Sequence, residues 1–199
     1  QISLEERYSL ELESLADVAE LVEADGSRPG SFLKGARDAD ALLTSWGIKI
    51  DQQIISGLEK CAVIGVGSVG GDMGDVDAAT EAGIVVTNVP DVFIEEVADH
   101  TLMLLLACAR RSKLMDKMVN DGKWYKGRPI LEQIPRLWGQ TLGLISFGNV
   151  ATAVARRAKP FGLNVIAYDP YVTELKMTAE GVQPVTLSEL YEKSDYISI

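Results

Sequence analysis

The sequence predicts an α/β protein with parallel sheets, because short apolar strands alternate with helical patterns and two of these strands run into glycine-rich turns. Its 199 residues, 47% hydrophobic and 24% charged, suit one or two globular domains. The N-terminal alternation is expected to form one parallel layer. In chain order it has a helix at 3–15, a strand at 19–23, a helix at 30–38, a strand at 41–44, a helix at 51–58 and a strand at 61–64.

The more specific of the two turns lies within residues 141–171. An apolar strand at 142–145 leads into Ser146-Phe147-Gly148-Asn149-Val150-Ala151, a variant of the G-x-G-x-x-G/A turn with serine in the first position. A helix with an apolar stripe follows and ends at Gly162. The next strand, 164–168, leads to Asp169, which follows Gly148 by 21 residues. That spacing is close to the value of about 20 for an acid that binds ribose.

Each part of this pattern suits a dinucleotide. Gly148 lacks a Cβ, so a pyrophosphate can approach the backbone, and the amides of Gly148, Asn149 and Val150 can bind its oxygens. Asp169 can accept both ribose hydroxyls and would repel a 2′-phosphate, which favours NAD over NADP. A methyl donor that carries adenosine could use the same acid and stays an alternative. Ser146 is expected to occupy an ordinary backbone region.

The other turn, Gly65-Val66-Gly67-Ser68-Val69-Gly70, matches G-x-G-x-x-G literally but has a weaker context. Gly71 and Gly74 disfavour a helix that begins directly after it, and only 75–81 is left to form a short one. The next strand, 84–87, ends without an acid at its tip. This turn is therefore expected to hold something smaller than a dinucleotide.

Several segments together carry a resemblance to a known family. They are Ser68-Val69-Gly70-Gly71-Asp72, the stretch DAATEAGIVVTNVP at 77–90, the stretch EVADHT at 96–101, and Asp169-Pro170-Tyr171. In one collinear order over about residues 35–199, the chain resembles the D-isomer-specific 2-hydroxyacid dehydrogenase family.

The resemblance implies two doubly wound parallel-sheet domains. A flavodoxin-like substrate-binding domain, with its first strand missing, would occupy 1–92. A Rossmann NAD-binding domain would occupy 93–199, of which this chain would hold the first half. No proline or glycine interrupts 93–121, so one long helix or two abutting ones should enter the second domain.

The same resemblance implies an NAD-dependent oxidoreductase that transfers a hydride between NAD(H) and a small D-2-hydroxy acid or 2-keto acid. It assigns the first turn to the substrate, whose carboxylate the amides of Val69 and Gly70 would hold, and the second turn to NAD. Thr101, expected at the start of the long helix, would lie near the nicotinamide. The alternative function is a non-catalytic NAD-sensing module, as in the corepressors that share this fold.

This chain departs from the family pattern at two places. Met73-Gly74 stands where the family usually has Asn-Val or Asn-Ile, and Ser146 stands where it has glycine. The family's catalytic arginine, glutamate and histidine are expected beyond Ile199. Strand candidates after residue 140 are also fewer than the roughly six of a complete dinucleotide fold. We therefore expect a fragment that is inactive by itself.

Composition argues against several other classes of protein. The net charge of −10 disfavours binding to nucleic acid, and no apolar run reaches the roughly 18 residues of a membrane helix. Cys61 and Cys108, both on elements expected to be buried, suit a reduced, cytoplasmic protein. The aromatic residues of 122–139 are expected to make packing or dimer contacts, so a homodimer is expected.

Two other candidate sites are set aside. His100, the only histidine, lies four residues after Glu96 on a predicted helix, where an ion pair or a domain contact explains it. Asp72, Asp75 and Asp77 have the spacing of a calcium loop, but no glutamate closes it at the right distance. We therefore expect no metal and no catalytic residue within this chain.

Overall fold

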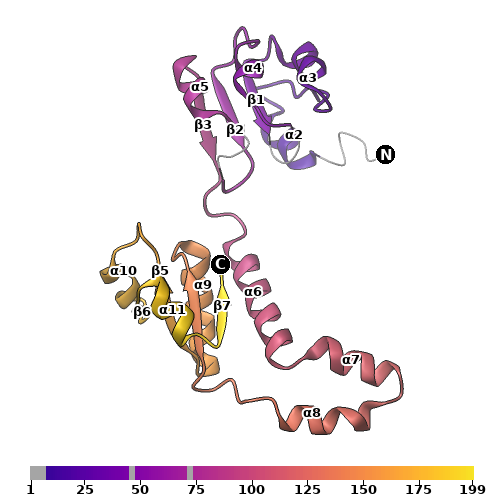
Figure 1. Cartoon of the computed structure of the whole chain (residues 1–199). Helices are drawn as coiled ribbons and strands as arrows, with labels where there is room; N and C mark the ends of the chain where they lie inside the picture. The colour runs from indigo at the N-terminus through magenta and orange to yellow at the C-terminus, as the bar shows by residue number, and fades with distance from the viewer. Residues whose placement is uncertain (1–7, 45–47, 71–73) are drawn as a thin grey trace. The chain divides into compact units, whose positions relative to one another are not determined.

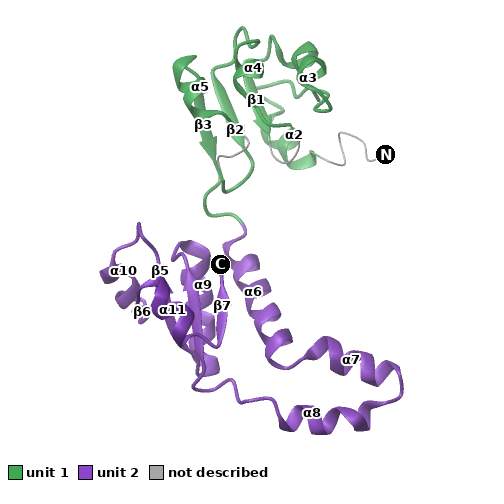
Figure 2. Ribbon diagram, in the orientation of Figure 1, with its two compact units in different colours: residues 1–92 green, residues 93–199 purple. Residues whose placement is uncertain are grey.

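The computed structural model describes residues 8–44, 48–70 and 74–199. The chain divides into two compact units, Gln1–Val92 and Phe93–Ile199, shown in Figures 1 and 2. Each unit has its own parallel sheet and its own apolar core. The parallel α/β class expected from the sequence is therefore confirmed. Three residues discussed above, Gly71, Asp72 and Met73, lie outside the described part of the chain, as do residues 3–7 of the helix expected at 3–15.

The sheet of the first unit is parallel and runs in sequence order, β1 (Ala41–Thr44), β2 (Val63–Val66) and β3 (Val85–Asn88). Short helices alternate with these strands. The helices are α2 (Ser9–Leu15), α3 (Pro29–Ala36), α4 (Gln52–Ile55) and α5 (Val76–Glu81).

Side-chain caps and one shared core position these elements. The carboxylate of Asp51 accepts a hydrogen bond from Ile54 N at 3.0 Å, and that of Asp75 accepts one from Ala78 N at 3.0 Å, so each aspartate begins a helix. Asp75 is thus a helix cap in this structure. The core of the unit is formed by Phe32, Ala36, Leu42, Ile50, Ile54, Ile55, Ile64, Val66, Ala79 and Ile84.

The prediction of a strand at 19–23 is wrong. These residues are irregular in the structure, and Val22 is 65% exposed. A strand needs a neighbour to pair with its backbone groups, and residues 19–23 pair with none of the strands described here. Strand 41–44 is confirmed at its expected bounds, whereas β2 lies two residues later than the strand expected at 61–64.

The sheet of the second unit is also parallel, with strand order β6-β5-β4-β7. Its strands are β4 (Thr141–Ile145), β5 (Asn164–Tyr168), β6 (Gln183–Pro184) and β7 (Tyr196–Ser198). Numbered in chain order, this is 3-2-1-4, the first part of the doubly wound order 3-2-1-4-5-6. The order reverses at β4, which pairs with β5 on one side and β7 on the other. Ligands of such sheets bind at this reversal, beyond the carboxyl ends of the strands.

The helix expected at 93–121 is two abutting helices. The first is α6 (Ile94–Ala109) and the second is α7 (Ser112–Asn120), and Arg111 between them has a left-handed φ of 51°. The connector that follows contains η1 (Trp124–Gly127) and α8 (Arg128–Glu132). The remaining helical elements are α9 (Asn149–Ala158), η2 (Lys159–Phe161), α10 (Glu174–Ala179) and α11 (Leu187–Lys193).

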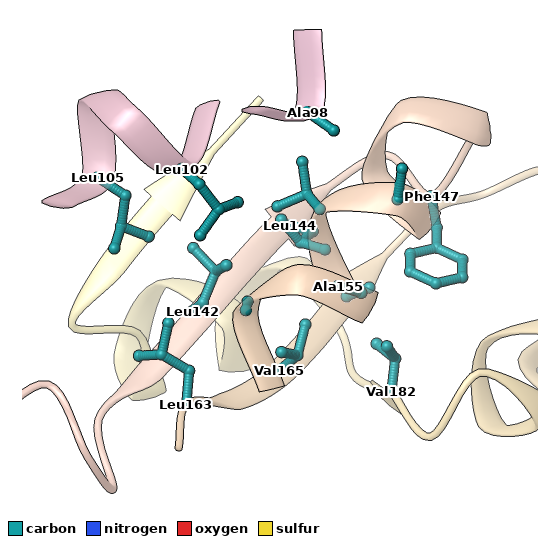
Figure 3. Packing of buried hydrophobic residues seen from close by; sticks show 14 of the residues in the cluster. Ala98, Leu102, Leu105, Leu142, Leu144, Phe147, Ala155, Leu163, Val165 and Val182 are labelled. Carbon is teal, nitrogen blue, oxygen red and sulfur yellow. The ribbon is translucent and has the colours of Figure 1, made fainter. Parts of the chain in front are cut away.

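Helix α6 packs on α9 and contributes to the core of the second unit. Figure 3 shows Leu102 and Leu105 of α6 beside Leu142 of β4, and all three are buried. Arg157 of α9 adds a polar link, because its Nε donates to Asp99 Oδ1 at 2.7 Å and its other end pairs with Glu95. The expected glycine stop is confirmed at Gly162, whose φ is +77°. Among the described helices, none is long and apolar enough to cross a membrane.

Candidate functional site

The turn between β4 and α9 lies where the strand order of the second sheet reverses. Ser146 N donates to Tyr168 O at 2.8 Å, which continues the pairing of β4 with β5 by one residue. The next residue, Phe147, is completely buried. Gly148 then has an extended backbone and stands at the N-cap of α9. The chain therefore leaves the sheet and enters a helix within three residues.

The expectation that Ser146 has an ordinary backbone conformation is wrong. Its φ is +78°, in the left-handed region that favours glycine. The physical reason lies on both sides of the residue: its own amide is bound to β5, and the next side chain is fixed in the core. The backbone between these two fixed points takes the glycine-type conformation although the residue has a Cβ. Such strain costs on the order of 1–3 kcal/mol.

We expect Ser146→Gly to stabilise the second unit. Relief of the left-handed strain gains about 1–2 kcal/mol, and the greater freedom of glycine in the unfolded chain offsets about 0.5–1 kcal/mol of it. Thermal unfolding of the two proteins checks this, and a lower melting temperature for the variant would contradict it. Because the backbone keeps its shape, NAD affinity should change by less than about tenfold. A gain of about a hundredfold would instead show that serine impairs the site.

Gly148 faces open space at the beginning of α9. Its φ is −81°, which any residue can adopt, and a Cβ built on it would meet no heavy atom of the described residues within 4 Å, its chain neighbours aside. The fold of the chain therefore does not require glycine here. What a side chain would fill is the space in front of the helix, where a ligand would approach the backbone.

The charges along α9 favour an anion at this end. Among the described residues, no side chain caps its first turn; no acidic residue lies in that turn, whereas Arg156 and Arg157 stand in the last turn. Backbone amides at a helix N-terminus and the helix dipole attract negative charge. Asn149 is exposed and Val150 is half-buried, so the sequence-predicted residues Gly148, Asn149 and Val150 form one continuous, accessible helix start. A pyrophosphate fits this geometry.

Asp169 lies directly against this turn. Its Oδ2 accepts a hydrogen bond from Phe147 N at 2.8 Å, and its Oδ1 accepts from Tyr171 N at 2.7 Å and Val172 N at 3.1 Å. These amides, that of Phe147 first, lower the pKa of the carboxyl group from its ordinary value. The group is therefore ionised at neutral pH, as an acceptor of ribose hydroxyls must be. The structure thus brings the acid and the helix start together from segments 21 residues apart.

The first glycine turn has a different geometry. Gly67 N donates to Thr44 O at 2.6 Å, and Val69 and Gly70 beyond it are exposed. Among the described residues, the next helix after this turn is α5, which begins at Val76. The short helix expected at 75–81 is confirmed. In the part of the chain that the structure describes, this turn therefore has neither an adjoining helix start nor an acid like those of the second turn.

One residue that supports the first turn was not anticipated. Asn88, the last residue of β3, donates from Nδ2 to Val69 O at 2.8 Å. The parallel register pairs Val66 with Asn88, which places the amide side chain beside the turn. An asparagine at the carboxyl end of the strand next to a glycine turn is the signal that would have found it. Asn88 orients the peptide unit whose neighbouring amides are assigned to the substrate.

The other candidate residues lie farther along α6. Thr101 is in the middle of this helix and not at its start as expected, and its hydroxyl donates to Val97 O at 2.8 Å. His100 is exposed on the same helix, and no ion pair joins it to Glu96 among the described residues. Val69 and Gly70 belong to the first unit, while Thr101 belongs to the second.

Comparisons with known proteins agree with this geometry. Residues 102–199 match the family model for the NAD binding domain of D-isomer specific 2-hydroxyacid dehydrogenases. A D-3-phosphoglycerate dehydrogenase from Methanocaldococcus jannaschii is 38% identical over 93% of this chain and 35% of its own length. A glyoxylate reductase from Korarchaeum cryptofilum is 37% identical over 84% of this chain and 51% of its own length.

A solved structure gives the same result. The D-lactate dehydrogenase from Aquifex aeolicus, crystallised with NAD and lactic acid, aligns with a TM-score of 0.84 at 27% identity. The alignment covers 98% of this chain and 57% of that enzyme. The chain thus spans about a third to a half of the length of the curated relatives it matches. Residues 102–199 thus belong to the NAD-binding domain family of the D-isomer-specific 2-hydroxyacid dehydrogenases, and the rest of the chain is similar to the same enzymes.

Proposed function

We propose that the complete protein is an NAD-dependent oxidoreductase that transfers a hydride between NAD(H) and a small D-2-hydroxy acid or 2-keto acid. The observation that carries this proposal is the open helix start at Gly148 with the Asp169 carboxylate bonded to the turn before it, inside the matched NAD-binding domain. The relatives described above are dehydrogenases and a reductase, and no observation favours the corepressor or the methyl-donor alternative.

In this proposal the chain's own residues bind and orient the reactants. Amides of Gly148, Asn149 and Val150 hold the pyrophosphate, and Asp169 contacts the ribose and disfavours a 2′-phosphate. Amides of Val69 and Gly70, oriented by Asn88, hold the substrate carboxylate. When bound, NAD supplies the hydride acceptor or donor. Thr101 is proposed to lie on the nicotinamide side, and we assign no proton-transfer residue within this chain.

Hydride transfer is tested with the complete protein. It should oxidise NADH in the presence of small 2-keto acids such as glyoxylate, hydroxypyruvate or pyruvate, and in reverse it should use D-isomers and not L-isomers. NADPH should be the poorer cofactor, because Asp169 repels its extra phosphate. Failure of NADH to bind, together with no turnover of any of these acids, would refute the proposal.

The first turn gives an independent prediction. We expect Gly70→Val in the complete enzyme to raise KM for the keto acid by about tenfold or more, because its branched side chain would obstruct the approach of the carboxylate to the amides, and one lost hydrogen bond to a charged group costs about 1.5–3 kcal/mol. NAD affinity should stay nearly unchanged. Steady-state kinetics and a separate NADH titration measure the two effects, and Val69→Ala, which adds no side-chain bulk to the turn, serves as control. Loss of NADH binding in Gly70→Val would mean that the two turns have exchanged roles.

A reduced, cytoplasmic homodimer is the proposed state of the protein. Both cysteines are free thiols, which supports a reducing compartment. Helix α7 and the connector after it carry large exposed apolar side chains, with Val119 of α7 63% exposed and Trp124 and Trp138 of the connector 70% and 76% exposed. Aromatic side chains in such exposure are typical of contact surfaces. Light scattering should give twice the mass of the monomer. The double variant with Trp124→Ser and Val119→Ser should give the mass of a single monomer.

A further inference from the structure

The carboxylate of Asp169 lies beside the proposed pyrophosphate site, where its negative charge alone would disfavour binding of the ligand. It is hydrogen-bonded to Phe147 N at 2.8 Å, and Phe147 is the central residue of the turn assigned to pyrophosphate. A negative charge beside a diphosphate opposes binding, because like charges repel. The geometry therefore points to a role for Asp169 that outweighs this repulsion.

The turn itself needs support. Ser146 is held at a φ of +78°, a conformation that a residue with a Cβ adopts only when the surroundings fix it. Two hydrogen bonds tie the turn to the end of β5. One runs from Ser146 N to Tyr168 O at 2.8 Å, and the other runs from Phe147 N to the Asp169 carboxylate. Without the second bond, the buried Phe147 amide would lose its acceptor.

The other oxygen of the Asp169 carboxylate is also held by hydrogen bonds. Oδ1 accepts hydrogen bonds from Tyr171 N and Val172 N, so the group bridges the turn before α9 and the loop after β5. A carboxylate has about four lone-pair positions, and three are used within the chain. About one therefore remains for a ribose hydroxyl. Most of the hydrogen-bonding capacity of Asp169 serves the protein and not the ligand.

We propose that Asp169 is a positioning residue that holds the Ser146-Phe147-Gly148 turn in its phosphate-binding shape, in addition to contacting the ribose. This inference rests on the proposed NAD function. Asp169→Asn tests it, because the side chain keeps its size while one acceptor oxygen becomes an NH₂ donor. That donor must face either the Phe147 amide or the Tyr171 and Val172 amides, so one side of the bridge breaks.

The test uses ADP and 2′,3′-dideoxy-ADP, which lacks the ribose hydroxyls, in calorimetric titrations of the whole chain. We expect Asp169→Asn to weaken the binding of dideoxy-ADP by about tenfold or more, which is about 1.4 kcal/mol. Removal of a negative charge alone would have the opposite effect and strengthen a diphosphate ligand. Glu174→Gln, which removes an exposed carboxylate in the first turn of α10, is the matched control and should change affinity by less than about twofold. If Asp169→Asn binds dideoxy-ADP as tightly as wild type or more tightly, the inference is wrong.

A second readout needs no ligand. In the unliganded chain, the Phe147 amide should exchange with solvent about tenfold or more faster in Asp169→Asn than in wild type. An unchanged exchange rate at this amide would overturn the inference. If wild type binds neither nucleotide, the proposed function fails and the exchange rate alone decides. Should Asp169→Asn fail to fold, Asp169→Glu is measured in the same way, since it keeps the charge and displaces the oxygens by one methylene.

Discussion

Gly148→Asp is expected to abolish most NAD binding while the fold becomes slightly more stable. An aspartate at the N-cap of α9 can accept the first-turn amides and complement the helix dipole, which gains a few tenths of a kcal/mol relative to glycine. Apart from its chain neighbours, no heavy atom of the described residues lies within 4 Å of the new Cβ, so no clash opposes this gain. The same carboxylate fills the space assigned to pyrophosphate and repels it. Loss of two hydrogen bonds to a charged group amounts to about 3–6 kcal/mol, so affinity should fall at least about a hundredfold.

Thermal unfolding and calorimetric titration with NAD measure the two effects on the same sample. Gly148→Ala is the control for size without charge, and its loss of affinity should be smaller. Gly143→Ala is the opposite control. A Cβ on Gly143 would overlap Ser194 and Leu190, so that variant should be destabilised whether or not NAD is present. Unchanged NAD affinity in Gly148→Asp would show that the pyrophosphate does not bind at this helix start.

Asp169→Ala is expected to weaken the binding of NAD by about 1.5–3 kcal/mol through loss of the ribose contact alone, which is roughly ten- to a hundredfold in affinity. Loss of the bond to the Phe147 amide adds to this, because the turn is no longer held. The preference for NAD over NADP should narrow, since the charge that repels the 2′-phosphate is gone. Titrations with both cofactors check the two effects. Equal NAD affinity in wild type and variant would contradict the ribose assignment and the support of the turn together.

The sequence predicted strands correctly where an apolar run had a pairing partner. Strands 41–44 and 164–168 have their expected bounds, because each lies beside a neighbour in a parallel ladder. The run at 19–23 has similar residues but pairs with none of the described strands, and composition alone cannot show whether a partner is present. β6 is only two residues long, which is too short to leave a periodic pattern.

The sequence predicts the parts of the candidate site whose positions follow from spacing along the chain. It misses the parts whose conformation follows from packing. The distance in sequence from Gly148 to Asp169 places the acid at the tip of the strand next to the turn, and the structure has it there. The left-handed Ser146 was missed although the motif has glycine there, because the motif does not show whether a serine keeps the glycine conformation; the buried Phe147 ring and the amide bound to Tyr168 hold it in place. Asn88 was missed because its partner Val69 is 19 residues away, across a strand pairing.

The most direct test of the central claim is amide hydrogen exchange of the whole chain with and without NAD, resolved by residue. We expect NAD to protect the amides of 147–151 and those after Asp169, where the turn, the helix start and the acid lie together. The amides of 67–70 should exchange at the same rate in both samples. Protection at 67–70 with no change at 147–151 would show that the dinucleotide binds the first glycine turn, and would contradict the assignment of both sites.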